Sequence, residues 1–143
     1  MIRTFTALRF AAVLLVAAAL LAQTGQTYKA RLSAVPADAR TRAALAGIGS
    51  ATATLSGEKL TVSGSFEGLL SPATTAQLHA GELAGVRGPV IQDLTISKAT
   101  SGTISGSAEL TADQIQKLHK GGLYIQIQSE KEPEGVLWGW LLR

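Results

Sequence analysis

The chain contains no cysteine, and this absence removes several kinds of chemistry at once. Disulfides, a catalytic thiol and zinc sites built from thiolates all need cysteine. Small secreted domains often depend on disulfides, but a chain of 143 residues can bury a sufficient hydrophobic core without them. We therefore expect a domain that folds without covalent cross-links.

Long apolar runs are scarce too, and the longest lies near the N-terminus. The run Phe10–Ala22 has about 13 residues, fewer than the roughly 20 that a membrane-spanning helix needs. It follows Arg3 and Arg9 with no acidic residue before it, and polar residues begin at Gln23. This layout is typical of a secretory signal peptide.

We predict a signal peptide at residues 1–22, with cleavage after Ala22, although Leu20 rather than alanine stands three residues before the cut. The alternative is an uncleaved N-terminal anchor. After cleavage, residues 23–143 have the size of one ordinary domain. We expect this domain to be secreted or periplasmic.

Excess charge of one sign is also lacking once the signal peptide is set aside. The whole chain has 13 basic and 10 acidic residues; without Arg3 and Arg9, 11 basic residues face 10 acidic ones, which leaves a net charge of +1. A nearly neutral domain has no overall electrostatic attraction to nucleic acid or to anionic membranes. We expect no nucleic-acid partner and no stable membrane insertion after cleavage.

Apolar and polar residues alternate with period two through most of the remaining chain, as in half-buried strands. The runs Ala51–Leu55 and Leu60–Phe66 flank a Ser56-Gly57 turn and predict a β-hairpin. Frequent glycines separate these runs from one another. The pattern predicts an all-β sandwich or barrel of about eight strands, the other six being Tyr28–Ser33, Thr75–His79, Val90–Ser97, Thr103–Leu110, Leu123–Ser129 and Gly135–Leu142.

One helix interrupts the strands. Thr111 and Gln114 have the spacing of a capping box, and Gly121-Gly122 stops the chain after a single helical stretch, so we predict a short helix near residues 111–120. The segment Pro36–Leu45 is predicted as either a loop or a short helical crossing.

Several short motifs follow one another in a fixed order along the chain. They are Val35-Pro36, Gly49 with Ala51 and Leu55, Ala76 with His79-Ala80-Gly81, Gly88-Pro89-Val90, Leu110-Thr111, Leu118 with Gly121 or Gly122, Leu123-Tyr124, and Gly135 with Gly139 and Leu141. Their order resembles that of the CHRD domain, the module found in chordin and in many exported bacterial proteins. The resemblance covers about residues 28–142 and implies an Ig-like Greek-key sandwich similar to that of the copper/zinc superoxide dismutases.

The chain departs from this family at its polar positions. Typical members have a His-x-His pair on the central strand and a further histidine after the Leu-Tyr strand, where this chain has Gln77, His79 and Gln128. A first-row metal needs several converging imidazoles or carboxylates. We therefore interpret Gln77, His79 and Gln128 as the remnant of a polar cluster, with no metal, no cofactor and no catalytic set. His119, on the predicted helix, is expected to interact with the helix dipole.

The last strand has the opposite change, from polar to apolar. Val136, Trp138 and Trp140 alternate onto the face where the family has a glutamate and an arginine. In one interpretation, Pro36–Leu45 or the helix covers this face as a second core layer. In the other, the face is exposed and binds a protein partner or a second copy of the chain.

Two functions are compatible with these patterns. The first is an exported, non-catalytic binding or scaffold module of the CHRD type, which acts through protein–protein contacts. The alternative is a metal-binding or redox protein related to the superoxide dismutase-like fold, with a degenerate ligand set. Catalysis by paired carboxylates in Glu130–Glu134 is disfavoured, because charge around a Pro-Glu-Gly turn is typical of a solvated loop.

Overall fold

Eight antiparallel strands and one short helix make up residues 25–143, the part of the chain that this computed structural model describes. The predicted signal peptide at residues 1–22 lies outside the described residues. The elements are β1 (Gln26–Ala34), β2 (Ile48–Ser56), β3 (Lys59–Glu67), β4 (Ala73–Ala80), β5 (Val90–Ile96), β6 (Gly102–Glu109), α2 (Ala112–His119), β7 (Leu123–Ser129) and β8 (Leu137–Trp140).

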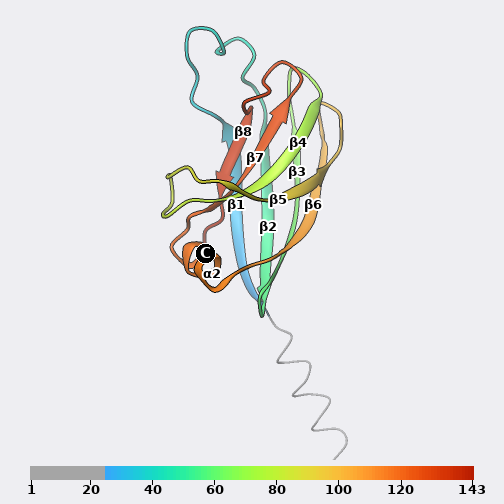
Figure 1. Cartoon of the computed structure of the whole chain (residues 1–143). Helices are drawn as coiled ribbons and strands as arrows, with labels where there is room; N and C mark the ends of the chain where they lie inside the picture. The colour runs from blue at the N-terminus through green and yellow to red at the C-terminus, as the bar shows by residue number, and fades with distance from the viewer. Residues whose placement is uncertain (1–24) are drawn as a thin grey trace, which may run out of the picture.

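The strands close into a barrel in the order β1-β2-β3-β6-β5-β4-β7-β8 (Figure 1). Of the two architectures that the alternation predicts, the chain forms the barrel rather than the sandwich that the family resemblance implies. Two short seams close it. Strands β1 and β8 pair through Ser33–Trp138 and Ala34–Leu137, and β5 and β6 pair through Thr95–Ser105 and Ile96–Ile104. The seams divide the barrel into a polar half (β1, β2, β3 and β6) and an aromatic half (β4, β5, β7 and β8), named for their outer faces.

Alternate residues from both halves fill the barrel. On β3, Leu60, Val62 and Phe66 are buried between exposed neighbours, as the period-two pattern predicts. On β7, Leu123, Ile125 and Ile127 are fully buried and belong to the same hydrophobic core. Because few strand pairs join the two halves at the seams, the shared core holds them together.

The hairpin and the helix form where the sequence predicts them. Strands β2 and β3 pair from Ser56–Lys59, next to the turn, to Ile48–Glu67 at their other end. Gly57 in the turn lies in the left-handed region at φ +62°. The Gln114 amide donates to the Thr111 hydroxyl at 3.2 Å, and the Thr111 amide donates to the Gln114 side chain at 3.0 Å, which completes the capping box. No helix within residues 25–143 is long and apolar enough to cross a membrane.

The connection between β1 and β2 is a loop with turns rather than a helical crossing. Asp38 organises it, because its carboxylate accepts hydrogen bonds from the amides of Arg40 and Thr41 at 2.8 and 2.9 Å. These backbone hydrogen bonds lower the pKa of Asp38 below its usual value, and the bond from Thr41 has the larger effect.

Candidate functional site

The residues that the sequence marks as unusual meet on the outer face of the aromatic half. Paired residues of antiparallel strands place their side chains on the same face. The strand register therefore forms two rows across this face. The aromatic row contains Val90, His79, Tyr124 and Trp140, and the amide row contains Asp93, Gln77, Gln126 and Trp138.

The rings of the aromatic row are packed against one another. The His79 ring stacks on Tyr124 with centroids 4.7 Å apart and an interplanar angle of 16°. Tyr124 in turn packs against Trp140 at 4.9 Å, and Trp140 meets Trp138 edge-on at 4.8 Å. Such contacts add to the stabilisation from burial alone, by about 0.5–1.5 kcal/mol for each pair. The rings of the row therefore hold one another in place.

The loop between β4 and β5 fastens to this row through Gly88. The Gly88 carbonyl oxygen accepts hydrogen bonds from His79 Nδ1 at 2.9 Å and from the Tyr124 hydroxyl at 3.1 Å. The Gly88 amide donates to the same hydroxyl at 3.1 Å. A side chain at Gly88 would overlap the carbonyl oxygen of Ala80, so only glycine permits this close approach.

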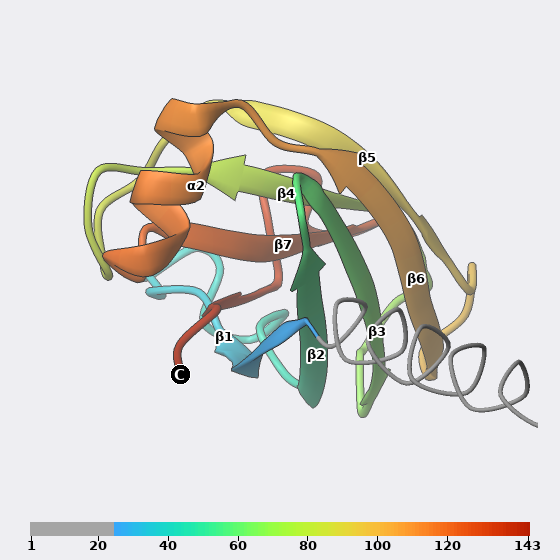
Figure 2. The ribbon, with the colours of Figure 1, turned by 90° about the horizontal axis from the view of Figure 1, so that it is seen from below.

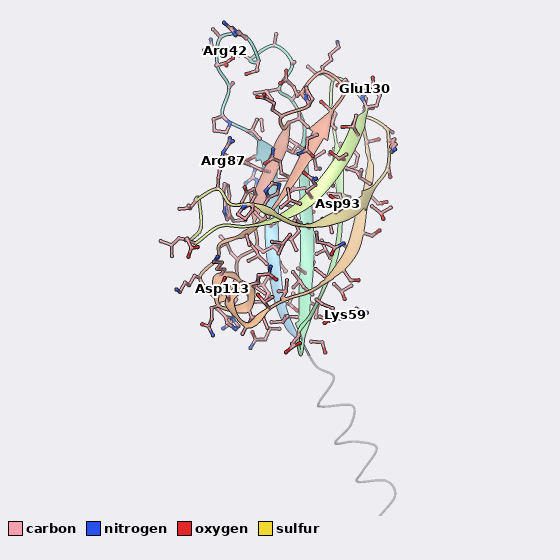
Figure 3. The ribbon with its side chains drawn as sticks, viewed as in Figure 1. Arg42, Lys59, Arg87, Asp93, Asp113 and Glu130 are labelled. Carbon is pink, nitrogen blue, oxygen red and sulfur yellow. The ribbon has the colours of Figure 1, made fainter. Side chains whose placement is uncertain are left out.

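Arg87, from the same loop, lies over Trp138 with its guanidinium carbon 4.7 Å from the ring centroid. Figure 3 shows Arg87 beside β8 and Asp93 further across the same half. Trp138 and Trp140 are half-buried. The face is thus neither fully exposed nor a second core layer, and the residue stacked on Trp138 comes from the β4–β5 loop rather than from Pro36–Leu45 or α2.

Val136 does not belong to this surface, and its assignment to the candidate partner face is wrong. Its side chain is 1 % exposed and lies in the hydrophobic core. The reason is local: Gly135 has φ +136° and β8 begins only at Leu137, so the alternation of β8 does not extend back to Val136. The partner surface is reduced to Trp138 and Trp140.

A hydrogen-bond chain with one direction runs from the neighbouring register pair, Thr75 and Gln128, into Gln77 and Asp93 of the amide row. Thr75 donates to Gln128 at 2.6 Å, Gln128 donates to Gln77 at 3.3 Å, and Gln77 donates to the Asp93 carboxylate at 3.0 Å. The structure brings Gln77 and Gln128 into contact but leaves His79 out of their network. Amides of this kind satisfy one another and do not exchange protons with a substrate.

Two buried polar atoms on the face have no hydrogen-bond partner within the described residues, His79 Nε2 and Trp140 Nε1. Because a carbonyl can only accept, His79 Nδ1 carries a proton and donates it to the Gly88 carbonyl oxygen. Residues 25–143 hold no group of three or more histidines and carboxylates that could surround a metal ion. His79 alone does not make a metal site.

Sequence reasoning missed Tyr124, Gln126, Arg87 and Gly88 as members of the site. Tyr124 and Gln126 could have been found, because they alternate with the apolar residues of β7 on the same side as Gln128. Arg87 and Gly88 lie in a loop without periodicity, and no sequence pattern indicates that the loop folds over this face.

The comparisons with known proteins give one match. The family model for the CHRD domain matches residues 28–141. No curated protein and no solved structure matches the chain. The matched range contains all eight strands except the first two residues of β1, and it contains both rows of the site.

Proposed function

The chain belongs to the CHRD domain family, and from this premise we propose that it is an exported, non-catalytic binding module that acts through protein–protein contacts. The proposed contact surface is the outer face of the aromatic half, centred on Trp138, Trp140 and Arg87. The observation that carries the proposal is the half-buried pair of tryptophans with an exposed arginine stacked on one of them.

Composition supports a protein partner. Tryptophan and arginine are the residues that most often dominate the energy of protein interfaces. Here they are held in place by Tyr124 and by the β4–β5 loop before a partner arrives. A surface that is already ordered loses less conformational entropy on binding. The partner is either another protein or a second copy of this chain.

The chemistry of the face supports a non-catalytic role. Gln77 and Gln128 occupy positions where histidines occur in typical members of the family, and neither amide titrates. The Asp93 carboxylate already accepts a hydrogen bond from Gln77. His79 is stacked and 8 % exposed, so a substrate has little access to its free nitrogen.

The alternative, a metal-binding or redox protein with a degenerate ligand set, draws on the topology. Strand β3 lies beside β6 and β4 lies beside β7, an order that Greek-key motifs produce. This order favours the proposed relation to the superoxide dismutase-like fold. Metal analysis of purified residues 23–143 separates the two functions, because stoichiometric copper or zinc, or a large loss of thermal stability with chelator, would establish the alternative.

The binding proposal is tested by replacing Arg87 and Trp138 in the exported protein. We expect Arg87→Ala, and Trp138→Ala more strongly, to weaken co-purification of the partner or self-association measured by light scattering. Arg42→Ala is the matched control, since Arg42 is an exposed arginine of the β1–β2 loop. If the variants associate as the unmodified protein does, while remaining folded, the aromatic half is not the contact surface.

A further inference from the structure

Two large apolar side chains protrude from the tip of the β4–β5 loop. Leu83 is 53 % exposed and Val86 is 43 % exposed. The Val86 amide donates to the Leu83 carbonyl at 3.1 Å, and Gly85 between them has φ +83°, so the tip is a tight turn. Residues at turns are usually polar. Apolar side chains held outward by a fastened loop therefore indicate a contact surface.

The last residues of the described chain add a third apolar side chain beside this loop. Leu142 is 48 % exposed and pairs with Lys29 through two backbone hydrogen bonds of 2.7 and 2.9 Å. A Cβ atom added to Gly121 would lie 2.8 Å from the Leu142 side chain and 3.3 Å from that of Ala84. The loop, the end of α2 and Leu142 therefore meet at one place. Figures 1 and 2 both show the loop and α2 on the same side of the barrel.

Basic residues lie beside Leu142. A cavity of about 270 Å³ opens between α2 and the last residues, and its lining includes His119, Lys120 and Arg143. Arg143 Nη2 lies 3.2 Å from His119 Nδ1, and the Tyr28 hydroxyl lies 2.9 Å from the same nitrogen, so His119 contacts side chains in addition to its place at the helix end. We define the loop–terminus patch as Lys29, Leu83, Val86, Lys120, Leu142 and Arg143.

The positive charge of the patch is only partly cancelled by the acidic residues nearest to it. Glu82 and Asp113 both bind Lys117, at 2.9 and 3.1 Å, so these three groups carry a net charge of −1 beside the three cations of the patch. Within residues 25–143, no ion pair engages Lys29, Lys120 or Arg143. A nearly neutral domain thus has a local cationic and apolar surface that its net charge of +1 conceals.

The patch lies close to the point where the N-terminal segment joins the barrel. Arg143 Nη2 donates to the side chain of Gln26, the first residue of β1, at 2.6 Å. The apolar run that we predict as a signal peptide ends at Ala22, four residues before Gln26. Four residues span at most about 14 Å. In a folded chain that retains the run as an uncleaved anchor, the membrane that holds the run is therefore within reach of the patch.

We propose that the loop–terminus patch docks the domain on an anionic lipid bilayer. Leu83 and Val86 enter the headgroup region, and Lys120 and Arg143 hold lipid phosphates at the mouth of the cavity. A convex apolar tip beside cations suits a bilayer surface better than a groove of another protein. The contact is peripheral and reversible, so it is compatible with the absence of stable insertion that we expect after cleavage. It uses none of the residues of the proposed protein-binding face.

The test is co-sedimentation of residues 23–143 with lipid vesicles, since the complete barrel and its core lie within residues 25–143. We expect binding to phosphatidylcholine vesicles that contain phosphatidylglycerol, weakening as salt increases, and little binding to phosphatidylcholine alone. Leu83→Ser with Val86→Ser should weaken binding by about tenfold or more. Each cation removed by Lys120→Gln or Arg143→Gln should weaken it by about fivefold.

Controls of the same chemistry lie elsewhere on the surface. Ile48→Ser with Leu70→Ser removes two exposed apolar side chains outside the patch, and Arg42→Gln removes a cation at the opposite end of the molecule from Asp113 and α2 (Figure 3). These controls should leave vesicle binding unchanged. No binding to anionic vesicles, or equal binding by patch and control variants, overturns the proposal. If the unmodified domain does not bind vesicles but the patch variants lose self-association, the patch is a contact between two copies of the chain. Loss of partner binding in Arg87→Ala tests only the protein-binding face.

Discussion

The two halves of the barrel are alike inside and different outside. In the polar half, β3 alternates between buried core residues and exposed threonine, serine and lysine. In the aromatic half, every residue of β7 is buried except Gln128, which is half-buried. A strand can be buried on both faces only if something covers its outer side. Here the outer side of β7 carries stacked rings, and the β4–β5 loop fastens onto them.

The difference between the outer faces indicates that the aromatic half has features that folding alone does not require. The strands of the polar half show the alternation that filling the barrel requires. The aromatic half has two orphaned polar atoms, a glycine that no other residue can replace and an arginine held over a tryptophan. These features are expected at a binding surface, and they make the two outer faces respond differently to substitution.

The largest contrast should come from truncating the centre of the aromatic row. Tyr124 is 1 % exposed and contacts rings on β4 and β8, so Tyr124→Ala should lower the free energy of unfolding by about 3–5 kcal/mol. Thr61→Ala, on the outer face of the polar half, should change it by less than about 0.5 kcal/mol. Denaturant unfolding measures both. Equal effects would show that the outer faces do not differ energetically.

The next contrast concerns the fastening of the loop. Gly88→Ala should cost about 2–3 kcal/mol, because the new methyl group overlaps the Ala80 carbonyl and pushes the loop away from Tyr124. Gly85→Ala is the control, since space is open there and only the φ of +83° opposes alanine, at a cost of about 1 kcal/mol. Tryptophan fluorescence should shift for Gly88→Ala alone. A shift for both variants would mean that the turn, rather than Gly88, holds the loop.

A smaller effect is expected from the half-buried tryptophan that Arg87 covers. Trp138→Ala should destabilise the domain by about 1–2 kcal/mol, between the values typical of surface and core positions. Acrylamide should quench tryptophan emission partially in the unmodified protein and more strongly in Arg87→Ala. Quenching as complete as that of free tryptophan would show that the loop does not shield this face in solution.

The smallest effect on stability is expected in the β1–β2 loop, which Asp38 organises. The pKa of Asp38 is lowered by backbone hydrogen bonds from Thr41 and Arg40, so these bonds stabilise the loop above the ordinary carboxylate pKa and are lost as pH falls through the lowered one. In Asp38→Asn, the NMR chemical shift of the Thr41 amide should no longer change as pH falls through the carboxylate pKa. The melting temperature should stay nearly unchanged. An unchanged titration of the Thr41 amide in the variant would contradict the assignment to Asp38.

Local patterns predicted the elements well because their causes are local. Alternation located all eight strands, and the pair Thr111 and Gln114 located the helix, since side-chain direction and capping depend on neighbours within a few residues. Closure into a barrel could not be predicted in this way. It depends on pairs such as Ser33–Trp138, which join opposite ends of the chain and leave no periodic trace.

The site was predictable only in part for the same reason. Spacing by two placed Gln77 with His79, and Trp138 with Trp140, on shared faces. Their juxtaposition across β7 depends on register, and their cover depends on a loop whose position is fixed by Gly88. Val136 was misplaced because the alternation was extended across Gly135, where the backbone turns.

The two seams also determine the units in which the molecule opens. Each seam has two residue pairs between its strands, and the β1–β8 seam gains only the bridge between Lys29 and Leu142 beyond the end of β8. Strands β2 and β3 or β4 and β7, in contrast, are paired along most of their length. Amide hydrogens near the seams should therefore exchange with solvent through low-energy fluctuations that leave each half intact, while those inside a half exchange only when the shared core is lost. The barrel is closed in geometry, but we expect it to open as two four-stranded sheets joined along a common core.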